Sequence, residues 1–197
     1  HLLGLLLMQL AQFVERAGRC ASAALERVVE HRRQIEKGQM PEPDLVGVAL
    51  GSGGTAAGLA VGFEELGMKS KVVGVSVSHP SPALSIAAQR LARKTALEIG
   101  LTSAAASKAV RRLQVTGRFV GRGYGHRTPD SDAATKRAAD AGIVLDATYT
   151  AKAFAGALEC VRRPGNPTVL YWHTLSAVHP PPSHDALPKS LDRLLRA

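Results

Sequence analysis

Residues Gly51–Gly58 read GSGGTAAG and come directly after the apolar run Leu45–Leu50. A short aliphatic run of this kind predicts a buried β-strand. A helical pattern extends from about Thr55 to Leu66, where Gly67 ends it. A strand followed by glycines and the start of a helix presents free backbone N–H groups to an anion, and a Cβ would block the anion's approach. The stretch therefore predicts a phosphate-binding loop.

The residues after the loop narrow the choice of phosphate ligand. A Walker A loop ends in Gly-Lys-Ser or Gly-Lys-Thr, whereas Leu59 follows the last glycine here. The dinucleotide fingerprint fits loosely, with Gly51, Gly53 and Ala56, but it needs a carboxylate for the ribose near the end of the next strand. The segment Val75–His79 contains none. Nucleotide binding is therefore disfavoured, and a tight turn without a ligand stays open as an alternative.

Strand and helix patterns alternate along the rest of the chain. The predicted strands are Leu45–Leu50, Lys71–Val77, Ile143–Leu145 and Thr168–Trp172, with Val115, Phe119 and Val120 marking a further short strand. The predicted helices are one or two over 2–37, then Thr55–Leu66, Ala83–Ile99, Thr128–Ala141, Thr150–Val161 and Pro188–Leu195. This alternation predicts an α/β fold with an open, mostly parallel sheet and helices on both faces.

In such a sheet, ligands bind at the carboxyl ends of the strands. Three predicted strand exits are polar or glycine-rich, namely Gly51–Thr55, Asp146–Thr150 and His173–Ser176. We expect them to face one cleft. The expected organisation is an N-terminal helical segment over 1–40, an α/β domain over 41–178 and a C-terminal tail over 179–197.

Composition limits the other function classes. The chain has 197 residues and a formal net charge of +9, but the charges are spread and only 4% of residues are aromatic. Single-strand nucleic-acid binders stack bases on aromatic side chains, so we expect a basic solvated face and no nucleic-acid partner, with polyanion binding as the alternative. Cys20 and Cys160 form no CxxC motif, so neither a metal site nor a disulfide is predicted. Cysteines without a disulfide framework make a reduced, cytoplasmic setting the expectation. Leu2–Leu7 is too short to span a bilayer, so we expect no membrane partner.

Four segments together resemble one family of pyridoxal-phosphate enzymes. The stretch GSGGTAAGLAVG, residues 51–62, resembles the phosphate loop of the tryptophan-synthase-β type. Residues 123–130 resemble a YG-x-x-TP-(E/D) segment, 145–153 an LDPVYTGKA segment, and 169–174 a strand that ends in HTGG. These three narrow the resemblance to the 1-aminocyclopropane-1-carboxylate deaminase/D-cysteine desulfhydrase family. The resemblance covers about residues 26–178 and implies a partial cofactor domain of that type, with its N-terminal half missing.

The resemblance implies a role for each matching residue. It implies that pyridoxal 5′-phosphate is the cofactor, and the residues that would hold its phosphate are Gly51, Ser52, Gly53, Gly54 and Thr55. Thr174 would face the pyridine nitrogen, where a neutral hydroxyl gives a weaker electron sink than a carboxylate. Tyr124 and Tyr149 would be catalytic on the substrate side, with Thr150 beside the second. We expect His173 and Lys152 to be structural. The resemblance also implies a small amino acid as the substrate and allows a homodimer.

Two departures qualify that resemblance. Leu175-Ser176-Ala177 stands where the family has Gly-Gly, which leaves the substrate open. The family's Schiff-base lysine lies well over a hundred residues before the loop, but only 50 residues precede Gly51 and Lys37 is the only lysine among them. We therefore expect the C-terminal portion of a lyase or deaminase of the D-cysteine desulfhydrase or 1-aminocyclopropane-1-carboxylate deaminase kind, inactive alone. The alternative is a non-catalytic α/β domain that binds a phosphate ligand.

Overall fold

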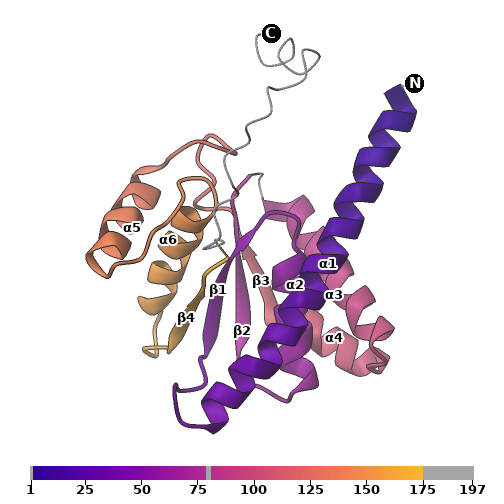
Figure 1. Cartoon of the computed structure of the whole chain (residues 1–197), viewed down its shortest axis with the longest axis horizontal. Helices are drawn as coiled ribbons and strands as arrows, with labels where there is room; N and C mark the ends of the chain where they lie inside the picture. The colour runs from indigo at the N-terminus through magenta and orange to yellow at the C-terminus, as the bar shows by residue number, and fades with distance from the viewer. Residues whose placement is uncertain (1, 79–80, 175–197) are drawn as a thin grey trace, which may run out of the picture.

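The computed structural model describes residues 2–78 and 81–174. Within them the helices are α1 (Leu2–Glu36), α2 (Gly54–Glu65), α3 (Ser81–Glu98), α4 (Ser103–Arg112), α5 (Pro129–Asp140) and α6 (Thr150–Val161). The strands are β1 (Leu45–Leu50), β2 (Lys71–Ser76), β3 (Leu113–Thr116) and β4 (Val169–Trp172). These strands form one parallel sheet in the order β3-β2-β1-β4. Helices α1 to α4 lie on one side of the sheet and α5 and α6 on the other (Figure 1). The predicted fold class is confirmed.

The strand register brings the carboxyl ends of the central strands to one edge. In β1, Leu50 lies opposite Ser76 of β2, and Val48 lies opposite Trp172 of β4. The residues that follow these strands therefore leave the sheet at the same side. Because both faces of the sheet are covered, β1 and β2 are almost fully buried, as their continuous aliphatic sequence predicts.

The glycines of α2 face α1. They recur every fourth residue, at Gly54, Gly58 and Gly62, and so form one stripe along the helix. A Cβ built at Gly58 would lie 2.2 Å from the carbonyl oxygen of Ala21, and one built at Gly54 would lie 2.3 Å from that of Ala17. The two helices thus touch backbone to backbone. The GSGGTAAG stretch holds a helix pair together as well as forming the loop.

One predicted strand is wrong, and one helix was not predicted. Ile143–Leu145 is not a strand, because the N–H of Ile143 donates to the carbonyl of Ala138 at 2.9 Å and Gly142 adopts φ 72°, which together cap the end of α5. Helix α4 was missed, because its buried residues are two small alanines, Ala106 and Ala109, rather than large aliphatic side chains.

The remaining sequence predictions fall partly outside the described residues. Strand β3 ends at Thr116, and Phe119 and Val120 follow it as buried loop residues rather than strand residues. The one or two helices expected over 2–37 form the single helix α1. The helix expected over Pro188–Leu195 and the tail over 179–197 lie outside the described residues, and the domain boundaries stay predictions.

Candidate functional site

A cavity of about 530 Å³ lies at the carboxyl edge of the sheet. This volume falls within the roughly 300–1,000 Å³ of typical small-molecule sites. Its walls come from α1, the loop after β1, the segment after β2, the start of α3, and the residues before α6 and after β4. The lining residues are Cys20, Ala49, Gly51, Ser52, Gly53, Gly54, Thr55, Ser78, Leu84, Tyr124, Tyr149 and Thr174. The three predicted segments therefore each contribute to one cavity, although Asp146–Thr150 does not follow a strand, and Tyr124 joins them.

The glycine loop offers the cavity an uncapped helix start. Gly53 is the N-cap of α2, with φ 85° and no side-chain capping hydrogen bond. The N–H of Ala57 donates to the carbonyl of Gly53 at 2.9 Å, so the N–H groups before it have no acceptor within the helix. A Cβ at Gly53 would lie 2.9 Å from the Cβ of Ala88 in α3. Both its backbone angle and its surroundings therefore require glycine there.

Two tyrosines line the cavity beside the glycine loop. The ring of Tyr149 covers Gly51, since a Cβ at Gly51 would lie 3.0 Å from the Cε1 atom and 3.2 Å from the hydroxyl of that ring. The ring of Tyr124 meets Tyr149 edge-on, with centroids 5.7 Å apart. Tyr124 is 58% exposed and Tyr149 36%. Both phenol groups are thus within reach of a ligand seated on the loop.

Asp146 fixes the turn that carries Tyr149. One carboxylate oxygen accepts the N–H groups of Thr148 at 2.9 Å and Tyr149 at 2.7 Å, and the other accepts the N–H of Thr150 at 3.0 Å and its hydroxyl at 2.5 Å. Burial alone would raise the pKa of Asp146, but these hydrogen bonds to the charged form outweigh it and lower the pKa. No role was predicted for Asp146 from the sequence, although an Asp just before a helix is a capping signal.

Most of the chain matches one known protein family. Residues 11–174 match the family model described as pyridoxal-phosphate dependent enzyme. The chain belongs to this family.

Two D-cysteine desulfhydrases are among the similar relatives. The one from Klebsiella pneumoniae subsp. pneumoniae is 35% identical over 142 residues, and the one from Klebsiella pneumoniae strain 342 is 34% identical. Each match covers 68% of this chain and 42% of the relative. The solved structure of an ACC deaminase homologue, at 24% identity and a TM-score of 0.55, covers 77% of this chain and 43% of its own. This pyridoxal-phosphate family chain thus spans less than half the length of these relatives.

The cavity suits the phosphate of pyridoxal phosphate but has no lysine to bind its aldehyde among the described lining residues. The uncapped start of α2 suits a phosphate group, whose charge the helix dipole favours. The lining residues in the described part of the chain include no lysine. Lys152 of α6 is fully buried, and its ammonium donates to three backbone carbonyls. Burial lowers its pKa.

Thr150 and His173 do not line this cavity. Thr150 is 1% exposed, and its hydroxyl bonds to Asp146 rather than pointing at the loop. Its substrate-side role stays a prediction, as do the roles of the residues that do line the cavity. His173 lies at the end of β4, with its ring 5.5 Å from that of Tyr171.

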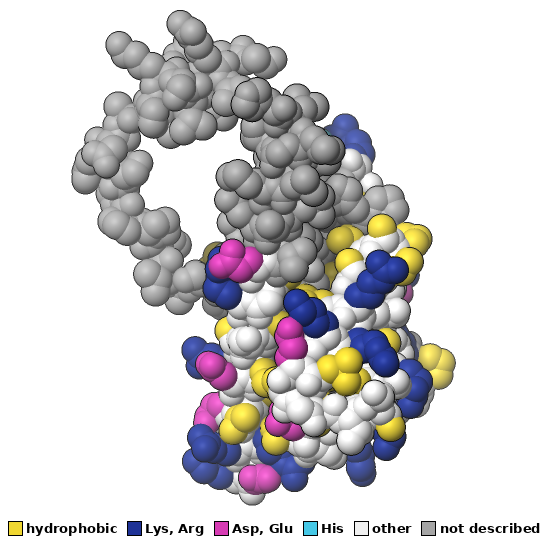
Figure 2. Space-filling view, turned by 90° about the vertical axis from the view of Figure 1, so that its right-hand side faces the viewer, with side chains coloured by type: hydrophobic (Ala, Val, Ile, Leu, Met, Phe, Trp, Pro, Cys, Tyr) yellow, Lys and Arg dark blue, Asp and Glu magenta, His cyan; other side chains and the backbone are white. Residues whose placement is uncertain are grey.

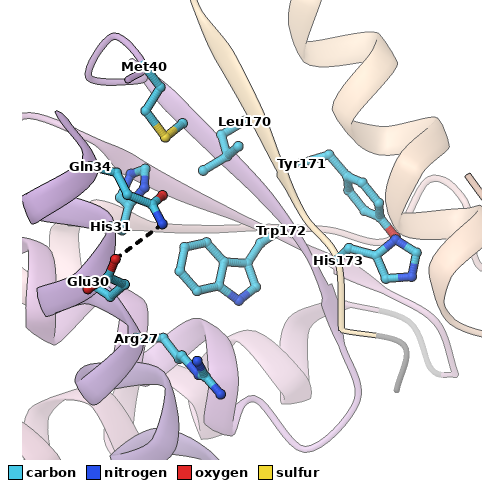
Figure 3. A pocket seen from close by; sticks show the side chains of 9 residues that line it. All are labelled: Arg27, Glu30, His31, Gln34, Met40, Leu170, Tyr171, Trp172 and His173. Carbon is cyan, nitrogen blue, oxygen red and sulfur yellow. Dashed lines mark hydrogen bonds between the residues drawn. The ribbon is translucent and has the colours of Figure 1, made fainter. Parts of the chain in front are cut away.

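A second hollow, of about 290 Å³, lies between α1 and the outer edge of β4 (Figure 3). Trp172 points toward His31 of α1, with ring centroids 5.8 Å apart, whereas Tyr171 and His173 point to the other face of the strand. Burial lowers the pKa of His31, and Glu42 partly opposes this. Its Nε2 atom has no hydrogen-bond partner among the described residues. Among the described strands, β4 is the edge strand next to β1, and this hollow separates it from α1.

Charged side chains are spread over the surface. Figure 2 shows Lys and Arg side chains scattered over one face, with Asp and Glu among them, rather than gathered into one patch. Among the described residues, no group of three His, Cys, Asp or Glu side chains comes together to hold a metal ion. No helix in the described part of the chain combines the length and the apolar character that crossing a bilayer needs.

Proposed function

We propose that this chain forms the phosphate-binding wall of a pyridoxal-phosphate site in a lyase or deaminase that acts on a small amino acid. The observation that carries the proposal is the cavity in which the uncapped start of α2 faces Tyr124, Tyr149 and Thr174. The relatives named D-cysteine desulfhydrase and the neighbour named ACC deaminase homologue support this class of substrate.

Each lining residue then has a task. Backbone N–H groups of the loop Gly51–Thr55 and the hydroxyls of Ser52 and Thr55 hold the phosphate. The Thr174 hydroxyl would be the group beside the pyridine nitrogen and, being neutral, would not protonate it. When bound, the cofactor supplies an electron sink for a carbanion beside the amino group. The hydroxyls of Tyr124 and Tyr149 orient the substrate or carry a proton at its reacting carbon.

We place the lysine that binds the cofactor outside the described lining of the cavity. A lysine amine is the group that holds pyridoxal phosphate covalently, and none lines the cavity among the described residues. The proposal therefore assigns that lysine, and the groups that bind the substrate carboxylate, to polypeptide that this chain does not align with in its relatives. Homodimerisation and a cytoplasmic setting are further parts of the proposal.

The same missing lysine favours a second candidate, a non-catalytic domain that binds a phosphate ligand. Complementation separates the two. The chain is co-expressed with the part of Klebsiella D-cysteine desulfhydrase that it does not match, and sulfide release from D-cysteine is measured. Release by the pair and not by either part supports the lyase proposal. Retained ligand binding without release supports the second candidate, and release by this chain alone contradicts both.

Ligand binding by the chain alone is tested by comparing its affinity for pyridoxine 5′-phosphate with its affinity for pyridoxine. Neither carries an aldehyde, so neither reacts with surface lysines. Calorimetry should detect binding of the phosphate ester only. Gly53→Ala should abolish it, because the added Cβ meets Ala88. Gly67→Ala is the matched control, since Gly67 also has a positive φ, at the other end of α2, but a Cβ added there would have nothing within 4 Å. Equal loss in both variants would refute the loop as the site.

A further inference from the structure

We propose that the Lys152 ammonium acts as a built-in monovalent cation that fixes the loop over 117–128 and so positions Tyr124 at the cavity. The loop joins β3 to α5, whereas Lys152 lies in the first turn of α6. Lys152 is a positioning residue in this proposal, because its ammonium touches backbone and not the ligand. Only the part that concerns ligand affinity rests on the proposed function.

Three carbonyl oxygens surround the ammonium. They belong to Val120 and Gly123, each at 2.8 Å, and to Val77 at 3.3 Å. The first two lie in the loop and the third directly follows β2. Lys152 is fully buried and has no salt bridge within the described ranges. A buried charge needs such compensation, and here carbonyl dipoles supply it, as they do for potassium ions in channel filters.

The acceptors stand next to residues of the cavity. Ser78 follows Val77 and Tyr124 follows Gly123, and both Ser78 and Tyr124 line the cavity. The ammonium therefore ties together two segments whose next residues form the wall. A shift of either carbonyl would move a lining residue with it.

Within the described residues, the turn before Tyr124 is otherwise held by local hydrogen bonds and by the ring contact of Tyr124 with Tyr149. Its own turn hydrogen bonds are local and long, such as that from the N–H of Gly123 to Val120 at 3.2 Å and that from His126 to Gly123 at 3.4 Å. Gly121, Gly123 and Gly125, which all adopt a positive φ, lose more conformational freedom on folding than other residues would. Phe119 and Val120 pack into the interior, but Tyr124 is more than half exposed. Apolar packing thus secures the start of the loop, and the ammonium secures the turn before Tyr124.

Trypsin tests the fixation without any cofactor. Arg122 is exposed and lies between the two loop acceptors, so cleavage after it reports on the loop. Lys152→Ala removes the ammonium and leaves space for an ion, and we expect cleavage about tenfold faster than in the wild type. Potassium or ammonium chloride should restore protection, whereas choline chloride at the same ionic strength should not. Lys152→Met, which fills the space, should not be rescued by any salt.

The matched control is Lys136→Ala, on the exposed face of α5, which should leave cleavage unchanged in every salt. Wild-type protection of Lys152→Ala in choline chloride, or equal rescue by choline and potassium, would overturn the proposal. So would a Lys152→Ala chain that stays unfolded in all salts, because the side chain would then serve core packing.

Affinity for pyridoxine 5′-phosphate links the loop to the cavity. In Lys152→Ala it should fall about tenfold in choline chloride and recover in ammonium chloride. Cation-dependent protection without any ligand binding by the wild type would contradict the proposed function and leave the fixation by Lys152 standing. Binding that ignores the cation would contradict the positioning of Tyr124.

Discussion

Replacing Gly58 with alanine tests whether α1 and α2 touch backbone to backbone. The new Cβ would lie 2.2 Å from the carbonyl oxygen of Ala21, more than 1 Å inside ordinary contact. The obstacle is backbone, so rotamer changes cannot relieve it, and overpacking of this kind costs about 3 kcal/mol at the upper end. Alanine regains about 1 kcal/mol of helix propensity over glycine. The net expectation is a loss of about 2 kcal/mol in the free energy of unfolding.

Gly18→Ala is the matched control. Gly18 lies inside α1, and a Cβ added there would have nothing within 4 Å. Only the propensity gain applies there, so this variant should be more stable than the wild type by about 1 kcal/mol. The two variants should therefore differ by about 3 kcal/mol, or roughly 6–12 °C in melting temperature for a chain of this size.

Urea and thermal unfolding followed by circular dichroism measure both variants. A Gly58→Ala chain as stable as Gly18→Ala would refute the close helix contact. Gly62→Ala adds a graded check, because its Cβ would meet only side chains, the nearest being Val28 at 3.0 Å. Its stability should lie between those of the other two variants.

Three other predictions concern the site. Asp146→Asn should lower the free energy of unfolding by about 1–2 kcal/mol at neutral pH. Because folding lowers the pKa of Asp146, the carboxylate stabilises the fold above the ordinary carboxyl pKa, and this stabilisation is lost as the pH falls through the folded-state pKa. In urea titrations the stability difference between variant and wild type should therefore shrink in acid, and a difference that stays constant with pH would contradict the capping role. Cys20 is half-buried and lines the cavity, whereas Cys160 is buried and burial raises the pKa of its thiol. Iodoacetamide should therefore label Cys20 first, and pyridoxine 5′-phosphate should slow the labelling of Cys20 only. Equal labelling rates at both thiols would count against the cavity. Tyr149→Phe should leave unfolding within about 0.5 kcal/mol of the wild type but abolish sulfide release in the complemented enzyme, and full release would remove Tyr149 from the proton-transfer role.

Strong local patterns made the central sheet predictable. Strands β1 and β2 are aliphatic runs bounded by glycine or polar residues, and burial on both faces follows from that composition. The helix from Thr128 was equally clear, since Thr128 and Ser131 form a capping box with Pro129 in the first turn. In these segments local and tertiary preferences agree, so the sequence suffices.

Other features depend on contacts that no local pattern carries. Ile143 and Val144 are apolar residues that follow a glycine at the end of a helix. Such residues can begin a strand or complete a helix C-cap, and here they complete the cap of α5. The stripe of Gly54, Gly58 and Gly62 is visible in the sequence, but its partner helix is not. Lys152 could be expected to be structural, yet its three acceptors come from segments that lie 29 to 75 residues away.

The backbone contact between α1 and α2 also fixes the direction of the α2 helix dipole. The dipole of α2 points its positive end at the cavity, and its axis is held by carbonyl groups of α1 that press on the glycine stripe. Side chains between two helices yield by changing rotamer, but a backbone cannot. A ligand bound at the start of α2 therefore meets a dipole whose direction cannot adjust unless α1 moves as well.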